Sequence, residues 1–234
     1  MEDRNAYFNF EGRPSDSAFV ESIWRTQSEC EGAFISTAET HWEMVVTRYK
    51  GELTITMRGP ETKAKHAPFP KDAEFFGIIF KYGAFMPHLP VSALVDEDVH
   101  LPEAANGAFW LHSAAWELPT FENADDFIDR LVREEMLVFD PVVEEVLQKR
   151  PLDLSLRTVQ RRFLRATGLT RGAFEQIERA RQATILLKEG ASIADAIFQA
   201  GYADQPHLTR SLKHFMGQTP GQILQPGSRA ARLR

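Results

Sequence analysis

Four glycines divide the last third of the chain into segments with a helical pattern: Gly168, Gly190, Gly201 and Gly217. Ser155, Ser192 and Asp204 stand at the start of three of these segments. A serine or aspartate before a helix and a glycine after it are the usual boundaries of a helix. Residues 171–188 form the longest segment, with apolar side chains at helical spacing. The sequence therefore predicts an all-α C-terminal region in which a long helix connects shorter ones.

The last two of these helices predict a helix-turn-helix. Residues 192–200 and 204–216 are joined by a short turn, as that motif requires. At about 100° per residue, one arc of the final helix is apolar, with Leu208, Leu212 and Phe215. The opposite arc carries Arg210 and Lys213, so this helix buries one face and offers cations on the other. A DNA major groove accepts a helix of this kind.

The helix that follows Ser155 repeats the arrangement. Its inward arc is apolar, with Val159, Phe163 and Ala166. Its outward arc carries side chains that suit base edges, since arginine bonds guanine and glutamine bonds adenine bidentately. These side chains are Arg157, Gln160 and Arg161. Arg162 and Arg165 lie further round the helix and are better placed for phosphates. For either helix taken alone, an ordinary solvated face is the alternative interpretation.

The charge of the chain is unevenly distributed. Residues 151–234 hold 13 Lys and Arg against 6 Asp and Glu, whereas residues 1–150 hold 14 against 27. Most of the C-terminal cations are arginines, whose planar guanidinium suits phosphate and guanine. A basic module carried by an acidic one suggests a polyanionic partner, although well-solvated arginine-rich helices would give the same balance. Together with the two helices, the charge indicates double-stranded DNA as the partner.

Residues 155–224 resemble the DNA-binding domain of AraC/XylS-type bacterial transcription regulators. The stretches SLRTVQRRF and ATGL, starting at Ser155 and Ala166, are similar to the first recognition helix of that family. The stretches AGYADQ, HLTR and GQTP, starting at Ala200, His207 and Gly217, are similar to its C-terminal signature. The resemblance implies two helix-turn-helix units at the ends of a long helix, which enter successive major grooves on one DNA face. It also implies base contacts for Arg157, Gln160 and Arg161, and for Gln205, His207 and Arg210.

The chain departs from the family pattern in both units. Lys149, Pro151 and Asp153 precede the first unit, where the family usually has a small alanine and then a glycine. We therefore expect an irregular support helix there. In the second unit Ile197 occupies a position that is commonly alanine, and Pro206 replaces a commonly polar residue that contacts bases. A proline in the first turn of a helix is tolerated.

The first 120 residues carry strand signals instead. Residues 42–49 and 53–57, separated by Lys50-Gly51, predict a β-hairpin, and residues 75–80 predict a buried strand. Helical signals return after Pro119, where Asn123 and Asp140 are expected N-caps. We therefore predict an α+β chain of two domains and a tail. A sensor or dimerisation domain, mainly β, spans residues 1–120, a helical DNA-binding domain spans 121–226, and a basic tail spans 227–234.

Residues 15–120 also resemble the sensor domains of that family, which implies a small-molecule effector, a homodimer, or both. Aromatic residues of this region are the candidates for a ligand pocket. They are Trp24, Trp42, Phe76, Phe80 and Trp110. The alternative is that these residues form the core of a β domain.

Metal binding and catalysis have little support in the sequence. His41 and Glu43 share a strand face, with His66 or His112 as further ligands, but the His-x-His cluster of metal-binding barrels is absent. We expect no metal and no other cofactor. The single cysteine, Cys30, has no local base motif, so a nucleophilic role is not expected, and one cysteine favours a reducing compartment.

The leading interpretation is a cytoplasmic, sequence-specific transcription regulator of the AraC/XylS type, an activator or a repressor, with no enzymatic activity. Its expected partners are double-stranded DNA, a small-molecule effector, RNA polymerase and a second copy of the chain. No membrane segment and no secretory signal are expected. Two alternatives remain open. One is a small-molecule-binding protein or enzyme in which the helical part is an assembly module, and the other is a helical protein–protein adaptor.

Overall fold

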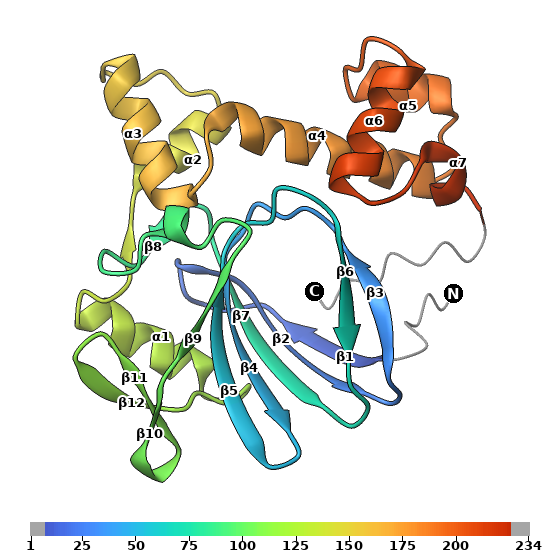
Figure 1. Ribbon diagram of the computed structural model, residues 1–234. Helices are drawn as coiled ribbons and strands as arrows, with labels where there is room; N and C mark the ends of the chain where they lie inside the picture. The colour runs from blue at the N-terminus through green and yellow to red at the C-terminus, as the bar shows by residue number, and fades with distance from the viewer. Residues whose placement is uncertain (1–7, 226–234) are drawn as a thin grey trace.

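The computed structural model describes residues 8–225, without the side chain of Asn106. An antiparallel sheet of six strands forms most of the N-terminal part, in the order β1-β2-β7-β4-β5-β9 (Figure 1). Its strands are β1 (Phe8–Arg13), β2 (Val20–Ser28), β4 (Glu43–Tyr49), β5 (Glu52–Arg58), β7 (Glu74–Phe80) and β9 (Asp98–Leu101). A separate antiparallel pair, β3 (Gly32–Ser36) and β6 (Lys65–Phe69), stands across from this sheet (Figure 1). We call residues 8–120 the β part.

The predicted hairpin is confirmed as β4 and β5. Lys50 and Gly51 connect the two strands with φ angles of 51° and 82°. Two successive residues of positive φ form the tight turn that matches the twist of paired strands. The predicted strand at residues 75–80 is β7, which lies between β2 and β4. Its last four residues are buried, because both faces of this central strand are covered.

The two faces of the sheet contact different clusters. Ile23, Met44 and Ile78 share one face and belong to the main core. Trp24 and Val45 flank Gly77 on the other face, in a small cluster with Ile79. The Trp24 ring covers Gly77 so closely that a Cβ built there would lie 2.3 Å from it. The absence of a side chain at position 77 therefore makes room for the indole.

Smaller elements connect the sheet to the helices. The short strand β8 (Ala84–Phe85) pairs with β13 (Val138–Phe139), and the short 3₁₀ helix η1 (Val91–Ala93) follows β8 in the chain. A three-stranded sheet follows, formed by β10 (Glu103–Ala104), β11 (Ala108–Leu111) and β12 (Ala114–Glu117), with the turn η2 (Ala105–Gly107). Helix α1 (Ala124–Arg133) packs on it, with the Phe127 ring 6.1 Å from that of Trp116. The expected cap at Asn123 is wrong in detail, because its side chain caps no helical N–H and instead accepts a hydrogen bond from Thr120 N–H at 2.7 Å.

The remaining helices lie together beyond one end of the sheet (Figure 1). They are α2 (Pro141–Leu147), α3 (Leu156–Thr167), α4 (Arg171–Lys188), α5 (Ile193–Gln199), α6 (Gln205–Phe215) and α7 (Pro220–Ile223). The predicted caps at Asp140, Ser155, Ser192 and Asp204 are confirmed, since each side chain accepts a hydrogen bond from the first turn. The α+β class, with two helix-turn-helix units on a long helix, is confirmed.

A continuous hydrophobic core joins the β part to the helices. It extends from Ile78 in the sheet through Val91 and Leu94 to Phe163 in α3 and Ile177 in α4. Folding of the helices therefore buries surface of the β part as well. The division at residue 120 stays a prediction, and the basic tail predicted at 227–234 lies outside the described residues.

Candidate nucleic-acid interface

The first helix-turn-helix unit consists of α2 and α3. Ser155 Oγ accepts a hydrogen bond from Thr158 N–H at 3.2 Å and so begins α3, and Gly168 ends it with a φ of 74°. The expectation of an irregular support helix is wrong: α2 is a regular α-helix over Pro141–Leu147, and residues 148–154, with Lys149 at a positive φ of 55°, lie outside any helix. The residues that differ from the family pattern, at 149–153, therefore lie in the connection between α2 and α3 and not within either helix.

The faces of α3 agree with the sequence prediction. Phe163 and Ala166 are buried, and Val159 is half-buried against the core. The three residues predicted to contact bases are exposed: Arg157, Gln160 and Arg161. Since they share the side of α3 that turns away from the protein, they are accessible to a duplex.

Arg162 and Arg165, predicted to contact phosphates, are also engaged within the protein. Arg162 Nη2 donates to the buried carboxylate of Asp140 at 2.6 Å, and its Nε donates at 3.0 and 3.1 Å. Arg165 Nη2 lies 3.5 Å from the same carboxylate, and its guanidinium lies over the Phe85 ring at 4.6 Å. Asp140 therefore caps α2 and joins α2 to α3 at the same time. The sequence signals only the first role, because the two partners are 22 residues apart.

The contact between Asp140 and Arg162 shifts the pKa of each group in the direction that favours its charged form. Burial raises the pKa of Asp140, but its hydrogen bonds with Arg162 and Val142 lower it, and the net direction is down. The hydrogen bond with Asp140 likewise raises the pKa of Arg162. Arg161, Arg162 and Arg165 also line a surface hollow of about 470 Å³. Three guanidinium groups around one hollow suit an anionic oxygen such as that of a phosphate.

The second unit consists of α5 and α6. Asp204 accepts a hydrogen bond from His207 N–H at 2.7 Å, and Pro206 lies in the first turn of α6. The buried residues of α6 are the predicted ones: Leu208, Leu212 and Phe215. Gln205, Arg210 and Lys213 are exposed. Of the proposed contacts in this unit, His207 alone is half-buried, with its ring edge-on to that of Tyr202 at 5.1 Å.

Helix α4 connects the two units, which lie at its opposite ends (Figure 1). Its 18 residues make it about 27 Å long. Its bounds agree with the predicted 171–188, and its buried residues are Phe174, Ile177, Ala180, Ala183 and Leu187. Ile197 of α5 is half-buried against the core, so the larger side chain at this position is accommodated.

One of three comparisons with known proteins identifies a family in the helical region. A family described as "Helix-turn-helix domain" matches residues 150–225. This part of the chain is therefore a helix-turn-helix domain. The solved structure of ToxT from Vibrio cholerae aligns with 93% of this chain and 98% of its own, at 10% identity and a TM-score of 0.36. A search of curated proteins found no match.

In the β part, the aromatic residues considered for a ligand pocket do not gather at one place. Trp42 and Phe80 stack at 3.9 Å within the main core, whereas Trp24 is buried on the other face of the sheet. Trp110 is 46% exposed on β11. Phe76 lines a surface hollow of about 510 Å³ together with Val46, Leu118 and Phe121. The structure thus places one of the five at a hollow.

The residues weighed as metal ligands lie apart from one another. His41 Nδ1 is 3.0 Å from the Glu39 carboxylate, His66 lies on β6, and His112 faces His88 with ring centroids 4.8 Å apart. Within residues 8–225, no three His, Cys, Asp or Glu side chains converge on one point where a metal ion would fit. None of the helices described has the length and apolar character of a membrane span.

Proposed function

We propose that this protein is a sequence-specific, DNA-binding transcription regulator without a reaction of its own, and that its β part responds to a small-molecule effector. The observation that carries the proposal is that α3 and α6 each bury an apolar face and expose arginine and amide side chains on the other. The helix-turn-helix match over residues 150–225 supports the same function.

Each unit supplies base contacts and phosphate contacts. Arg157, Gln160 and Arg161 contact base edges from α3, and Gln205, His207 and Arg210 do so from α6. The remaining cations contact phosphates: Arg162, Arg165 and Lys213. Helix α4 is about 27 Å long. With the width of the helices at its two ends added, the separation of the two units is compatible with the repeat of the major groove, which is about 34 Å. Both recognition helices can therefore enter successive grooves of one duplex.

The effector site belongs to the β part in this proposal. The hollow beside Phe76 has about 510 Å³, within the range of about 300–1,000 Å³ that holds a small molecule. Its walls combine apolar side chains with Arg25 and Arg48. We retain residues 1–120 as the sensor domain and 121–226 as the DNA-binding domain. Homodimerisation and contact with RNA polymerase stay predictions.

DNA selection tests the proposal. The full chain is incubated with random-sequence duplexes, because the continuous core argues against isolating the helices, and the bound sequences are determined. Arg210→Ala is expected to cost about 1–3 kcal/mol on the selected site and to relax selectivity at one base pair. Arg165→Ala is expected to weaken binding to all sequences alike and to reduce the slope of log K against log salt by about one unit.

Arg133→Ala is the matched control, because Arg133 is an exposed arginine of α1, outside both units. It should leave affinity and selectivity unchanged. If Arg210→Ala and Arg165→Ala lower affinity equally on every sequence, Arg210 does not contact a base. If the wild-type chain shows no salt-dependent DNA binding, the alternative of an assembly module replaces the regulator.

A further inference from the structure

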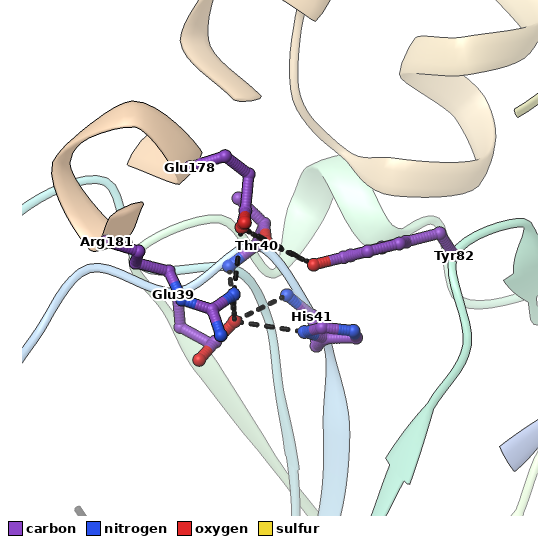
Figure 2. Close-up of polar contacts among 6 residues, drawn as sticks. All are labelled: Glu39, Thr40, His41, Tyr82, Glu178 and Arg181. Atoms are coloured by element: carbon purple, nitrogen blue, oxygen red, sulfur yellow. Dashed lines mark hydrogen bonds and ion pairs between the residues drawn. The ribbon is translucent and has the colours of Figure 1, made fainter. Parts of the chain in front are cut away.

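A group of polar side chains connects the middle of α4 to the β part (Figure 2). Glu178 and Arg181 project from α4 toward the segment that precedes β4 and toward Tyr82, which follows β7. We call this group the clasp, and it consists of Glu39, Thr40, His41, Tyr82, Glu178 and Arg181. None of these residues belongs to the predicted DNA contacts, and the proposed function leaves them without a role.

Hydrogen bonds join Tyr82, Thr40 and Glu178 within the clasp. Thr40 has one hydroxyl proton and donates it to the Glu178 carboxylate at 2.7 Å, since a carboxylate can only accept. The Tyr82 hydroxyl lies 2.7 Å from Thr40 Oγ1 and also donates to the Glu178 carboxylate at 3.5 Å. Burial raises the pKa of Tyr82, and Glu178 raises it further, so the hydroxyl keeps its proton. The chain from Tyr82 through Thr40 to Glu178 links the β part to α4.

Arg181 adds a second link. Its Nη1 donates to Glu178 at 2.9 Å and lies 3.5 Å from the buried carboxylate of Glu39. Burial lowers the pKa of Arg181, but the two carboxylates raise it, with a net increase, so it remains a cation. Glu39 is in turn held by Thr40 N–H at 2.9 Å. Glu39 is buried and Arg181 is only 20% exposed, so removing a partner leaves a charge with less compensation and makes the group sensitive to single substitutions.

The first helix-turn-helix unit rests on the β part. A Cβ on Gly168, at the end of α3, would lie 2.9 Å from the carbonyl oxygen of Val91 in η1. Arg165 of α3 lies over Phe85 of β8, and β13, which precedes α2, pairs with β8. The position of α3 is therefore set by the β part.

The second unit is attached differently. Helices α5, α6 and α7 pack on α4, and the end of α6 is held by two backbone amides of the β part. Ala38 N–H donates to Phe215 O at 2.7 Å, and Ala64 N–H donates to His214 O at 2.9 Å. These carbonyls belong to the last turn of α6, where intrahelical donors are lacking. The β part thus fixes the far end of the helical region as well as its near end, and the clasp lies between them.

We propose that the clasp sets the distance and angle between α3 and α6, and hence the spacing of the two half-sites that the protein accepts in DNA. The inference rests on the proposed function. The clasp residues do not touch DNA in this proposal. They position α4 on the same surface of the β part that also contacts α3. One extra base pair between the half-sites turns the second by about 34° and moves it by about 3.4 Å. A pair of recognition helices held rigidly cannot follow this change, whereas a loosened pair can.

The test compares selected DNA for four full-length chains. Glu178→Gln weakens the bonds to Thr40 and Arg181, and Thr40→Val removes the hydroxyl at nearly constant size. Glu175→Gln is the matched control, because Glu175 is on the same helix, outside the clasp, and pairs with Arg171 at 2.7 Å in an exposed position. Thermal unfolding confirms that each chain is folded. The readouts are the half-site sequences, their spacing, and the affinity for duplexes with one base pair inserted between the half-sites.

The wild type and Glu175→Gln should select one spacing and lose about tenfold or more in affinity on the insertion, since one recognition helix then loses its base contacts. Glu178→Gln and Thr40→Val should select the same half-sites at several spacings, and the insertion should cost them clearly less. Retention of one sharp spacing by both clasp variants would overturn the inference while leaving the proposed function intact. If the wild type selects no half-sites at all, the proposed function itself fails, and the clasp loses this role with it.

Discussion

The contact between Asp140 and Arg162 predicts a measurable loss of stability when the carboxylate becomes an amide. Asp140→Asn keeps the cap of α2, because asparagine caps a helix as well as aspartate does. It removes the negative charge that Arg162 approaches at 2.6 Å. Hydrogen bonds to charged groups are worth about 1.5–3 kcal/mol, but one third of the Arg162 side chain is exposed, so water replaces part of the interaction. We expect a loss of about 1–2 kcal/mol in the free energy of unfolding.

Thermal unfolding followed by circular dichroism measures this loss. For a chain of this size, 1–2 kcal/mol corresponds to a decrease in Tm of about 2–8 °C. Asp126→Asn is the control, since Asp126 is an exposed acid in the first turn of α1. A double-mutant cycle with Arg162→Met isolates the coupling between the two side chains. If Asp140→Asn lowers Tm no more than the control does, the contact contributes nothing to stability.

The contact between Asp140 and Arg162 also predicts how the stability of the protein changes with pH. The pKa of Asp140 is lower in the folded chain than its ordinary value of 3.8. The unfolded chain therefore takes up the proton first as the pH falls, and folding loses the contribution of this carboxylate. The stabilisation is complete well above pH 4 and disappears as the pH falls through the lowered pKa. The difference in the free energy of unfolding between the wild type and Asp140→Asn should become smaller below about pH 4. A difference that stays constant with pH would exclude a charge effect.

Substitutions at Gly217 and Gly77 test two close approaches to the backbone, and Gly201→Ala is the control for the first. Gly217→Ala and Gly201→Ala share a φ of 71°, but a Cβ on Gly217 would lie 2.7 Å from Ile35 of the β part, whereas Gly201 has open space. Both variants should lose about 1 kcal/mol in the free energy of unfolding, because alanine disfavours the left-handed conformation. Gly217→Ala should lose about 1 kcal/mol more, and its Ala64 amide should exchange hydrogen faster. Equal losses of stability would mean that the contact with Ile35 is unimportant. Gly77→Ala should lower the free energy of unfolding, measured in urea, by about 1–3 kcal/mol, because the new methyl group would overlap the buried Trp24 ring. Unchanged stability would show that the ring can move.

The helical elements of the C-terminal region could be predicted because their signals are local. Ser155 and Asp204 cap helices through hydrogen bonds that span three residues. Gly168 ends α3 because glycine enters the left-handed region at little cost. The faces of α6 followed from helical periodicity, which put Leu208 inside and Arg210 outside. Each of these features depends on residues within one or two helical turns.

The aromatic candidates show where the same approach fails. Trp24 and Trp42 are both tryptophans of the β part, but Trp24 lies in the small cluster on one face of the sheet and Trp42 lies in the main core. Which face a strand residue occupies depends on alternation and register, and register is set by partners far away in sequence. A list of aromatic residues therefore cannot specify a pocket.

The sequence by itself determined the helix boundaries, their amphipathic faces and the exposed arginines, because local hydrogen bonding and periodicity decide these features. The tertiary structure alone decided that Asp140 pairs with Arg162 and that Glu39 approaches Arg181, 142 residues away. It also decided that the β part holds both recognition helices. Such contacts form only when folding brings distant segments together, and no local pattern encodes the partner of a charged side chain.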